Sequence, residues 1–596
     1  MKTLLRIVSF GAFTLLTTLG VSHAQTLNET QGTGSGVSIS SGDYNTMYGD
    51  STGSALTSGH YTVFVGYRAG RYNTTSESVF IGYMAGYTNT TGFDNTFIGM
   101  EAGKSNTTGG DNTFFGAESG ENNTTGYDNT FMGEESGTAN TTGYENTFVG
   151  EDAGQQNTTG YKNTMVGNEA GISGETGYRN TGIGDEALSD YGDGDHNTAL
   201  GDSAGIDVDA GRWNVMVGAA SGVATEHADF NTFVGARSGW DNNRTNSTSN
   251  ANRNTYVGYE AGFTNREGED NVGMGAYADF DNTTRSRTIF IGSQATPSTN
   301  DVIMMGYLTY NDGQYSIMVG NESDNRGNYV VALGHSHDVE AAADYSIGIG
   351  KDADIDQSYA VGIGSDVVIN NTGAVAIGAT TSVSADNSVV IGKEATATAS
   401  NSIAIGYQAS VSTENTVFVG NATTTSVGGT VNWTATSDGR MKQNIAEDVP
   451  GLTFVNTLRP VTYNYDVYSM KAKLGQSGMD EATAEKSEMR YTGFIAQEVK
   501  AAADALGYDF SGVQVPEDEN QSMWGIRYAE FVVPLVKAIQ ELSAENQLQT
   551  DYIAQQGELL NQYEASLQRM EQRINMLEAQ AGPQNDAATT VSASKE

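Results

Sequence analysis

A short glycine-anchored motif returns along most of the chain, and its spacing constrains the fold more than any other feature. The motif is Asn-Thr-Phe followed by an aliphatic residue and glycine, as at residues 95–99. Counted from Gly66, its glycines form a row of 23, mostly 17 residues apart as far as Gly292 and mostly 14 apart beyond it. A fixed period too short for a helical hairpin, with a short apolar strand and a Gly/Asn/Thr turn, predicts a β-solenoid.

The motif also predicts how each coil is lined. Alternate residues of a strand point to opposite faces, so Thr96 and Ile98 share one face and Phe97 lies on the other. Stacked coils then form an aliphatic ladder and a second ladder that changes from aromatic to small side chains, as at Ala376. We expect the three extra residues of the longer repeat in exposed polar turns such as residues 106–109.

The shorter repeats carry a resemblance to a known family. Ala-Val-Ala-Ile-Gly at 374–378 and Ser-Ile-Ala-Ile-Gly at 402–406 resemble the head repeats of trimeric autotransporter adhesins. That resemblance implies a parallel β-roll with three chains around one axis. The division that we predict is an N-terminal segment at 25–60, a β-roll of 17-residue repeats at 61–292 and a β-roll of 14-residue repeats at 293–420.

Composition changes near residue 430, where glycine-rich repeats give way to proline and to helix-forming residues. We interpret residues 421–436 as a neck before a C-terminal module. The motifs of that module are Ser-Asp-Gly-Arg-Met-Lys at 437–442, Leu-Arg-Pro-Val-Thr-Tyr at 458–463, Gly-Phe-Ile-Ala-Gln-Glu-Val at 493–499 and Tyr-Ala-Glu-Phe at 528–531. In this order they resemble the endosialidase-type intramolecular chaperone domain over residues 437–542. The resemblance implies a small α+β domain that assembles a trimer.

The same resemblance implies self-cleavage by a serine-lysine dyad. The family cuts itself just before the serine of its Ser-Asp-x-Arg-x-Lys motif, so Ser437 and Lys442 correspond to the dyad and the bond after Thr436 to the cleavage site. No histidine or cysteine follows residue 436, and a lysine can act as the base where burial or a nearby cation lowers its pKa. The alternative is a surface turn with a solvated lysine. The other motif residues, serving either catalysis or an ion pair and a turn cap, are Asp438, Arg440 and Asn444.

A heptad pattern over residues 535–580 predicts a trimeric α-helical coiled coil, with an isolated amphipathic helix as the alternative. Polar residues within the pattern weaken the seam but can fix register and strand number. We expect a disordered tail at residues 581–596. One core row is Ile539, Asn546, Ile553, Leu560, Leu567 and Ile574, and the other is Leu535, Leu542, Gln549, Gln556, Tyr563, Met570 and Leu577.

Residues 1–24 have the features of a secretory signal peptide. Lys2 and Arg6 precede an apolar run, and Ser-His-Ala at 22–24 is a small-x-small cleavage site. The alternative, a single membrane anchor, is disfavoured by the short, glycine-interrupted run. We therefore predict a secreted or cell-surface protein with no membrane span in the mature chain.

Charge and cysteine content exclude several classes of function. The formal net charge of −42 disfavours nucleic acid and anionic membranes as partners. The absence of cysteine excludes disulfides and thiolate metal sites. Alternating carboxylates at 190–195 suit calcium but lack the full loop pattern, so a solvated acidic turn is favoured and no cofactor is expected. His335 and His337 would share a strand face, either as a metal pair or as two surface side chains, and we predict no metal there.

Taken together, the sequence predicts an exported trimeric fibre that resembles an adhesin and removes its own chaperone. Its partners would be two further copies of the chain and a glycan or protein receptor on a host cell or matrix. No activity on external substrates is expected, since regular repeats offer no singular pair of carboxylates in a groove. The alternatives are a phage-type tail fibre that binds a receptor, which the signal sequence disfavours, and an inert spacer.

Overall fold

The computed structural model describes residues 27–582 apart from 249, 477, 479–480 and 520–521. The expected signal sequence at 1–24 and most of the expected tail lie outside these residues. The chain divides into two compact units, Met1–Val419 and Gly420–Glu596.

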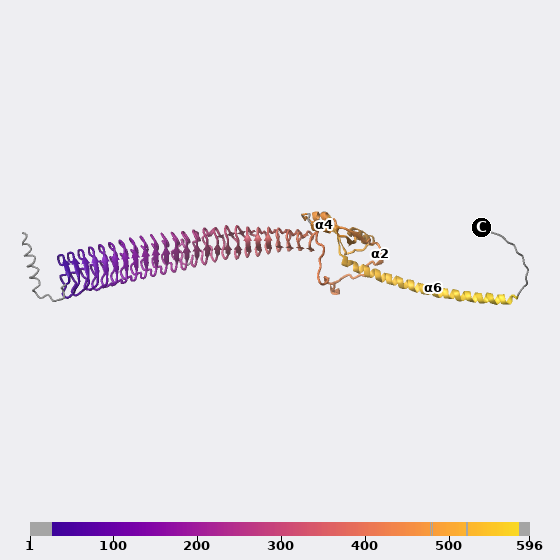
Figure 1. The fold of residues 1–596 in the computed structure, drawn as a ribbon, viewed down its shortest axis with the longest axis horizontal. Coiled ribbons are helices and arrows are strands. Elements are labelled where there is room, and N and C mark those ends of the chain that lie inside the picture. Colours follow the sequence, from indigo (N-terminus) through magenta and orange to yellow (C-terminus); the bar gives the residue numbers. More distant parts are fainter. Residues whose placement is uncertain (1–26, 249, 477, 479–480, 520–521, 583–596) are drawn as a thin grey trace, which may run out of the picture. The chain divides into compact units, whose positions relative to one another are not determined.

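The first unit is a parallel β-solenoid, as the repeat predicts (Figure 1). One sheet of 25 strands collects one strand from every coil. Neighbouring coils pair in register, so that Phe97 lies opposite Phe114 and Ile98 opposite Phe115. The strands of this sheet are β1 (Glu29–Gln31), β2 (Thr46–Tyr48), β3 (Val63–Val65), β4 (Val79–Ile81), β5 (Thr96–Ile98), β6 (Thr113–Phe115), β7 (Thr130–Met132), β8 (Thr147–Val149), β9 (Thr164–Val166), β10 (Thr181–Ile183), β11 (Thr198–Leu200), β12 (Val215–Val217), β13 (Thr232–Val234), β14 (Thr255–Val257), β15 (Val272–Met274), β16 (Ile289–Ile291), β18 (Ile303–Met305), β20 (Ile317–Val319), β22 (Val331–His335), β24 (Ile347–Lys351), β26 (Val361–Ser365), β28 (Val375–Ile377), β30 (Val389–Ile391), β32 (Ile403–Ile405) and β34 (Val417–Val419).

The solenoid has two features that the glycine row does not indicate: additional coils at its N-terminal end and a second sheet in its shorter coils. Strands β1 and β2 stack in register below β3, so two further coils lie ahead of the one that ends at Gly66. The shorter coils add a second parallel sheet of nine two-residue strands. These are β17 (Thr296–Pro297), β19 (Tyr310–Asn311), β21 (Asp324–Asn325), β23 (Asp338–Val339), β25 (Asp354–Ile355), β27 (Val368–Ile369), β29 (Ser382–Val383), β31 (Thr396–Ala397) and β33 (Ser410–Val411).

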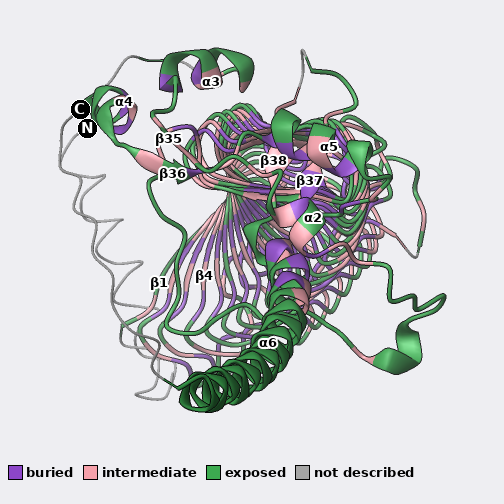
Figure 2. Ribbon diagram, turned by 90° about the vertical axis from the view of Figure 1, so that its right-hand side faces the viewer, coloured by how far each residue is buried: buried purple, intermediate pink, exposed green. Residues whose placement is uncertain are grey.

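Aromatic rings stacked along the inside of the coils form much of the core. The ring of Phe97 lies 4.9 Å from that of Phe80 and 4.7 Å from that of Phe114, nearly parallel to both. Each of these side chains is fully buried, and buried residues follow the inner side of the coils in Figure 2. Burial removes apolar area from water and stacking adds a smaller contribution, so one repeated residue stabilises each coil that carries it.

The repeated glycine is required by the close approach of the coils. Gly99 has φ of 147°, a conformation that side chains disfavour. A Cβ atom at this position would lie 2.0 Å from the carbonyl oxygen of Gly116 in the next coil. Any other residue would therefore force the two coils apart.

The Asn-Thr-Thr-Gly turns of the longer coils are only partly exposed, so the expectation for residues 106–109 is wrong for Asn106. This side chain is fully buried, whereas Thr108 is exposed. Its amide nitrogen donates to Oδ1 of Asn89 at 2.5 Å, and its Oδ1 accepts from Nδ2 of Asn123 at 2.7 Å. A buried amide needs such partners, and the constant spacing supplies them from the adjacent coils.

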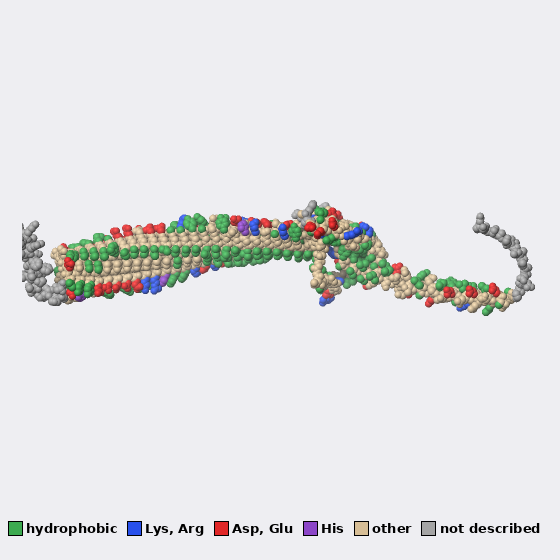
Figure 3. All heavy atoms as spheres, in the orientation of Figure 1, with side chains coloured by type: hydrophobic (Ala, Val, Ile, Leu, Met, Phe, Trp, Pro, Cys, Tyr) green, Lys and Arg blue, Asp and Glu red, His purple; other side chains and the backbone are tan. Residues whose placement is uncertain are grey.

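Apolar side chains also form a row on the outside of the first sheet. The third residue of each strand points outward, and Phe115, Met132 and Leu200 are 52%, 43% and 46% exposed. Rows of hydrophobic side chains run along the solenoid in Figure 3. An apolar surface that continues over so many coils is typical of a protein-protein contact.

The second unit has the expected α+β composition. Its core gathers Phe454, Val499 and Phe531 from three helical segments and Phe510 from a loop. Strands β35 and β36 pair antiparallel, as do β37 and β38. The elements are η2 (Gly439–Met441), α2 (Leu452–Val455), β35 (Val461–Tyr463), α3 (Val467–Lys473), α4 (Glu481–Glu488), β36 (Tyr491–Gly493), α5 (Ala496–Ala505), β37 (Val513–Gln514), β38 (Gly525–Ile526), η3 (Tyr528–Phe531) and α6 (Val532–Gln580).

The heptad segment forms one helix, α6, of 49 residues. Its heptad side chains lie on the surface, with Ile553 69% and Leu560 60% exposed. The structure thus confirms the helix, and the trimeric coiled coil stays a prediction. No helix among the described residues combines the length and the apolar character needed to cross a membrane.

Candidate functional site

The serine and lysine of the expected dyad lie on a short turn at the start of the second unit. Asp438 precedes the 3₁₀ helix η2, and its carboxylate accepts a hydrogen bond of 2.9 Å from the backbone nitrogen of Arg440. The guanidinium of Arg440 returns to both oxygens of the same carboxylate, with Nε at 3.1 and 3.0 Å. These bonds favour the ionised carboxyl and hold the pKa of Asp438 below its usual value.

This turn brings Ser437 and Lys442 together. Nζ of Lys442 donates a hydrogen bond to Oγ of Ser437 at 2.7 Å. The backbone nitrogen of Lys442 also donates to the carbonyl of Gly439 at 3.2 Å, which closes the turn between them. The contact is a geometric precondition for a serine-lysine pair.

The pair is open to water in the single chain. Thr436, Ser437 and Lys442 are all exposed, and the preceding residues 425–435 are exposed as well. Water favours the ammonium form of a lysine, and an ammonium cannot accept the proton of a hydroxyl. Chemistry at this pair would require a drier environment.

Asn444, the remaining residue of the motif, lies just beyond the turn. It has φ of 56°, a left-handed conformation that asparagine adopts more readily than most residues. Its side chain is exposed. Asp438 and Arg440 hold the turn together, and Asn444 redirects the chain after it.

A second feature, which sequence reasoning missed, is a contact between the hairpin α3–α4 and the first residues of the neck. Nζ of Lys486 donates to the carbonyl oxygen of Thr424 at 2.5 Å. The backbone nitrogen of Ala422 donates to Oε1 of Gln476 at 3.1 Å. No motif signals these residues, because both contacts use main-chain atoms of the neck.

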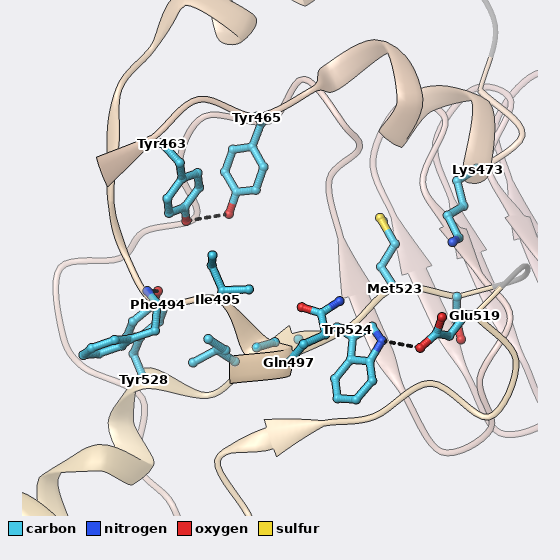
Figure 4. A pocket seen from close by; sticks show the side chains of 14 residues that line it. Tyr463, Tyr465, Lys473, Phe494, Ile495, Gln497, Glu519, Met523, Trp524 and Tyr528 are labelled. Atoms are coloured by element: carbon cyan, nitrogen blue, oxygen red, sulfur yellow. Dashed lines mark hydrogen bonds between the residues drawn. The ribbon is translucent and has the colours of Figure 1, made fainter. Parts of the chain in front are cut away.

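A third feature is a pocket of about 520 Å³ beside β36 and the start of α5 (Figure 4). Its wall is rich in aromatic rings, and the hydroxyls of Tyr463 and Tyr465 lie 3.2 Å apart. Burial and this neighbouring hydroxyl raise the pKa of Tyr463. Nε1 of Trp524 donates to a carboxylate oxygen of Glu519 at 2.9 Å on the opposite side. The pocket offers ring surfaces and a few polar atoms but holds neither Ser437 nor Lys442.

The other candidate positions do not assemble into a site. Asp190 lies among other carboxylates, and burial, followed by repulsion from Asp209, raises its pKa. His337 is buried at 2% exposure, whereas His335 is exposed and contacts Ser336, so the two rings do not form a pair. Within the described part of the chain, no group of three or more His, Cys, Asp or Glu side chains is arranged to hold a metal ion.

Comparison with known families agrees with the geometry of the second unit. Residues 437–508 match the chaperone of endosialidase family. The match of this chaperone segment begins at Ser437, the first residue of the turn that holds Lys442. It confirms the resemblance inferred from the ordered motifs, and the matched segment follows the solenoid in the sequence. No curated protein matches the chain in a sequence search.

Proposed function

We propose that the chain is an exported, trimeric, adhesin-like fibre whose chaperone segment assembles three copies and then cuts itself off before Ser437. The observation that carries the proposal is the chaperone match at residues 437–508, directly after the solenoid and neck. A chaperone fused to a long repetitive rod is useful where three such rods must be brought into one register. The receptor of the fibre would be a glycan or protein on a host cell or matrix.

Two exposed apolar surfaces support the trimer. The outward row on the solenoid, which includes Phe115 and Met132, would face the other chains across a common axis. The heptad rows of α6 would pack in the same way, since seven-residue spacing presents one face to partner helices. Both surfaces are costly in water and would be covered by copies of the same chain.

The proposed cut follows from the position of Ser437 immediately after the bond that breaks. Contact among three chains would exclude water from the turn and favour the neutral amine of Lys442. That amine would take the proton of the Ser437 hydroxyl, and Oγ would attack the carbonyl carbon of Thr436. The carbon-nitrogen bond breaks as an ester forms, the freed amine takes a proton, and water then hydrolyses the ester. The products are residues 25–436 and 437–596.

Mass spectrometry of the purified protein tests the cut. A new N-terminus reading Ser-Asp-Gly-Arg-Met-Lys is expected, and Ser437→Ala should leave a full-length chain. Lys442→Ala should stop cleavage as well, because the base is gone while the nucleophile remains. Light scattering on the Ser437→Ala chain should give three times the chain mass. Continued cleavage of Ser437→Ala at this bond, or a monomer in light scattering, would show that the proposal is wrong.

An inert spacer is the second candidate function, favoured by the uniformity of the solenoid surface. Coil after coil presents the same turn residues, as at residues 106–109 and 123–126. A glycan array probed with the mature fibre separates the two. Binding that survives washing supports a receptor-binding fibre, and its absence from glycans and matrix proteins supports a spacer.

A further inference from the structure

The hairpin α3–α4 and Gln476, together called the neck clamp, bind a defined piece of the chain. The piece is the neck start, residues 421–424. Lys486 and Gln476 hold it through the two hydrogen bonds described above, at 2.5 and 3.1 Å. Ala422 is 1% exposed and Lys486 is 7% exposed, so the contact excludes water.

The two buried lysines of the clamp have different partners. Nζ of Lys471 donates to the carbonyl of Gly478 and to the hydroxyl of Thr483, both at 2.8 Å, and so fastens the hairpin to itself. Lys486 instead donates outward to the neck, and its Nζ also lies 5.9 Å from the ring of Tyr465. Burial lowers the pKa of Lys486. A buried ammonium that loses its carbonyl partner is costly, so the clamp favours an occupied state.

The neck start also holds a turn of its own through local hydrogen bonds. Oδ1 of Asn421 accepts from the backbone nitrogen of Thr423 at 2.9 Å, and the backbone nitrogen of Thr424 donates to the carbonyl of Asn421 at 3.1 Å. The hydroxyl of Thr424 accepts from the backbone nitrogen of Asn421 at 2.8 Å. Local hydrogen bonds of this kind restrict the segment and so reduce the conformational entropy that it loses on binding, which favours a lasting contact.

In the sequence, the neck start precedes the proposed cut and the clamp follows it. Thr424 precedes the bond after Thr436, and Lys486 follows it. Residues 425–436 between them are exposed and contain no helix or strand. Hydrolysis of that bond would remove the covalent link and leave both hydrogen bonds in place.

We propose that the neck clamp is a binding surface for residues 421–424 of the cut fibre, and that it keeps the chaperone segment attached after cleavage. The inference rests on the proposed function, which supplies the cut. Three clamps in a trimer would act together, so the complex would dissociate far more slowly than one clamp releases its neck. Cleavage and release of the chaperone are then separate events.

The test supplies the cut from outside. A protease recognition sequence replaces residues 429–435 in the full-length Ser437→Ala chain, where the backbone is exposed. After digestion of the folded protein, the two pieces should elute together from a size-exclusion column. Lys486→Met should raise their dissociation rate on the order of tenfold or more, because it removes a charge-assisted hydrogen bond from each chain. Lys473→Met, an exposed lysine of the same hairpin, is the matched control and should change nothing.

Gln476→Ala provides a second variant if Lys486→Met does not fold, and it should also speed release. Pieces that separate at once without any substitution would overturn the inference, as would a Lys486→Met or Gln476→Ala complex as durable as the unsubstituted one. Failure of the proposed function is a different result, namely an unsubstituted chain that never cuts itself. The added protease makes the two outcomes independent.

Discussion

The stacked rings inside the solenoid make a sharp prediction about local stability. Phe131 is fully buried, with the rings of Phe114 and Phe148 each 4.8 Å away. Phe131→Ala removes a buried ring, at a cost of about 3–5 kcal/mol, of which the two stacked pairs account for about 0.5–1.5 kcal/mol each. Because each coil of a solenoid contacts only its neighbours, this loss should fall on the coils that carry these three residues.

Hydrogen exchange of the full-length Ser437→Ala protein measures the effect. Amides of residues 113–149 should exchange faster by about a hundredfold to a few thousandfold, since about 1.4 kcal/mol corresponds to a factor of ten. Exchange near β30 should not change. Phe93→Ala is the matched control, because Phe93 is 52% exposed, and it should alter exchange by less than about threefold.

Phe131→Leu keeps most of the buried volume and should give an intermediate acceleration. The reasoning would be refuted if the exchange rates of residues 113–149 in the Phe131→Ala protein stayed within threefold of those in the unsubstituted protein. An acceleration spread evenly over the whole solenoid would also refute it, because the coils would then not be stabilised by neighbour contacts.

Three further predictions concern the coil approach, pH and the long helix. Gly116→Ala places a Cβ 2.0 Å from the carbonyl oxygen of Gly133 at φ of 147°, so it should lower the melting temperature clearly, whereas Gly428→Ala, whose Cβ would meet no atom within 4 Å, should leave it unchanged. Burial raises the pKa of Asp279 to about 6. The folded state therefore favours its neutral form, and stability should fall by on the order of 2 kcal/mol as pH rises from about 4 to about 7; denaturant titrations of Asp279→Asn should lack this loss. Leu560→Glu puts a charge on a heptad position that is 60% exposed in the single chain, so it should leave helix content in circular dichroism unchanged but reduce the mass found by light scattering.

Much of the solenoid could be predicted because its signal is repeated. The glycine row and the alternation at Thr96, Phe97 and Ile98 identified the strand and its two faces, and the structure places Phe97 inside. The ladder of Asn106 was missed, since a polar residue in a turn reads as exposed unless its neighbours in the next coils are considered. Of the two coils ahead of Gly66, the first was missed because β1 has the polar sequence Glu-Thr-Gln and lacks the apolar centre of the others.

The second unit was predictable only in part. The ordered motifs indicated the chaperone family and directed attention to Ser437 and Lys442, which the structure places in contact. The neck clamp could not be found in this way. Lys486 binds a main-chain oxygen 62 residues away, and a main-chain partner leaves no trace in the sequence. The contacts of the proposed trimer would likewise involve other copies of the chain and so do not appear within one.

The in-register stacking of the coils has a consequence for how such a protein can evolve. Thr113, Thr130 and Thr147 pair in one column, with Phe114, Phe131 and Phe148 in the next. Deleting residues 117–133 would join Gly116 to Glu134 and bring Phe114 against Phe148, which makes the same contact as before. Slippage between near-identical gene segments can therefore shorten or lengthen the rod by whole coils, about 4.8 Å at a time, without a new core having to be selected. The reach of the fibre is thus free to vary among descendants while its two ends keep their chemistry.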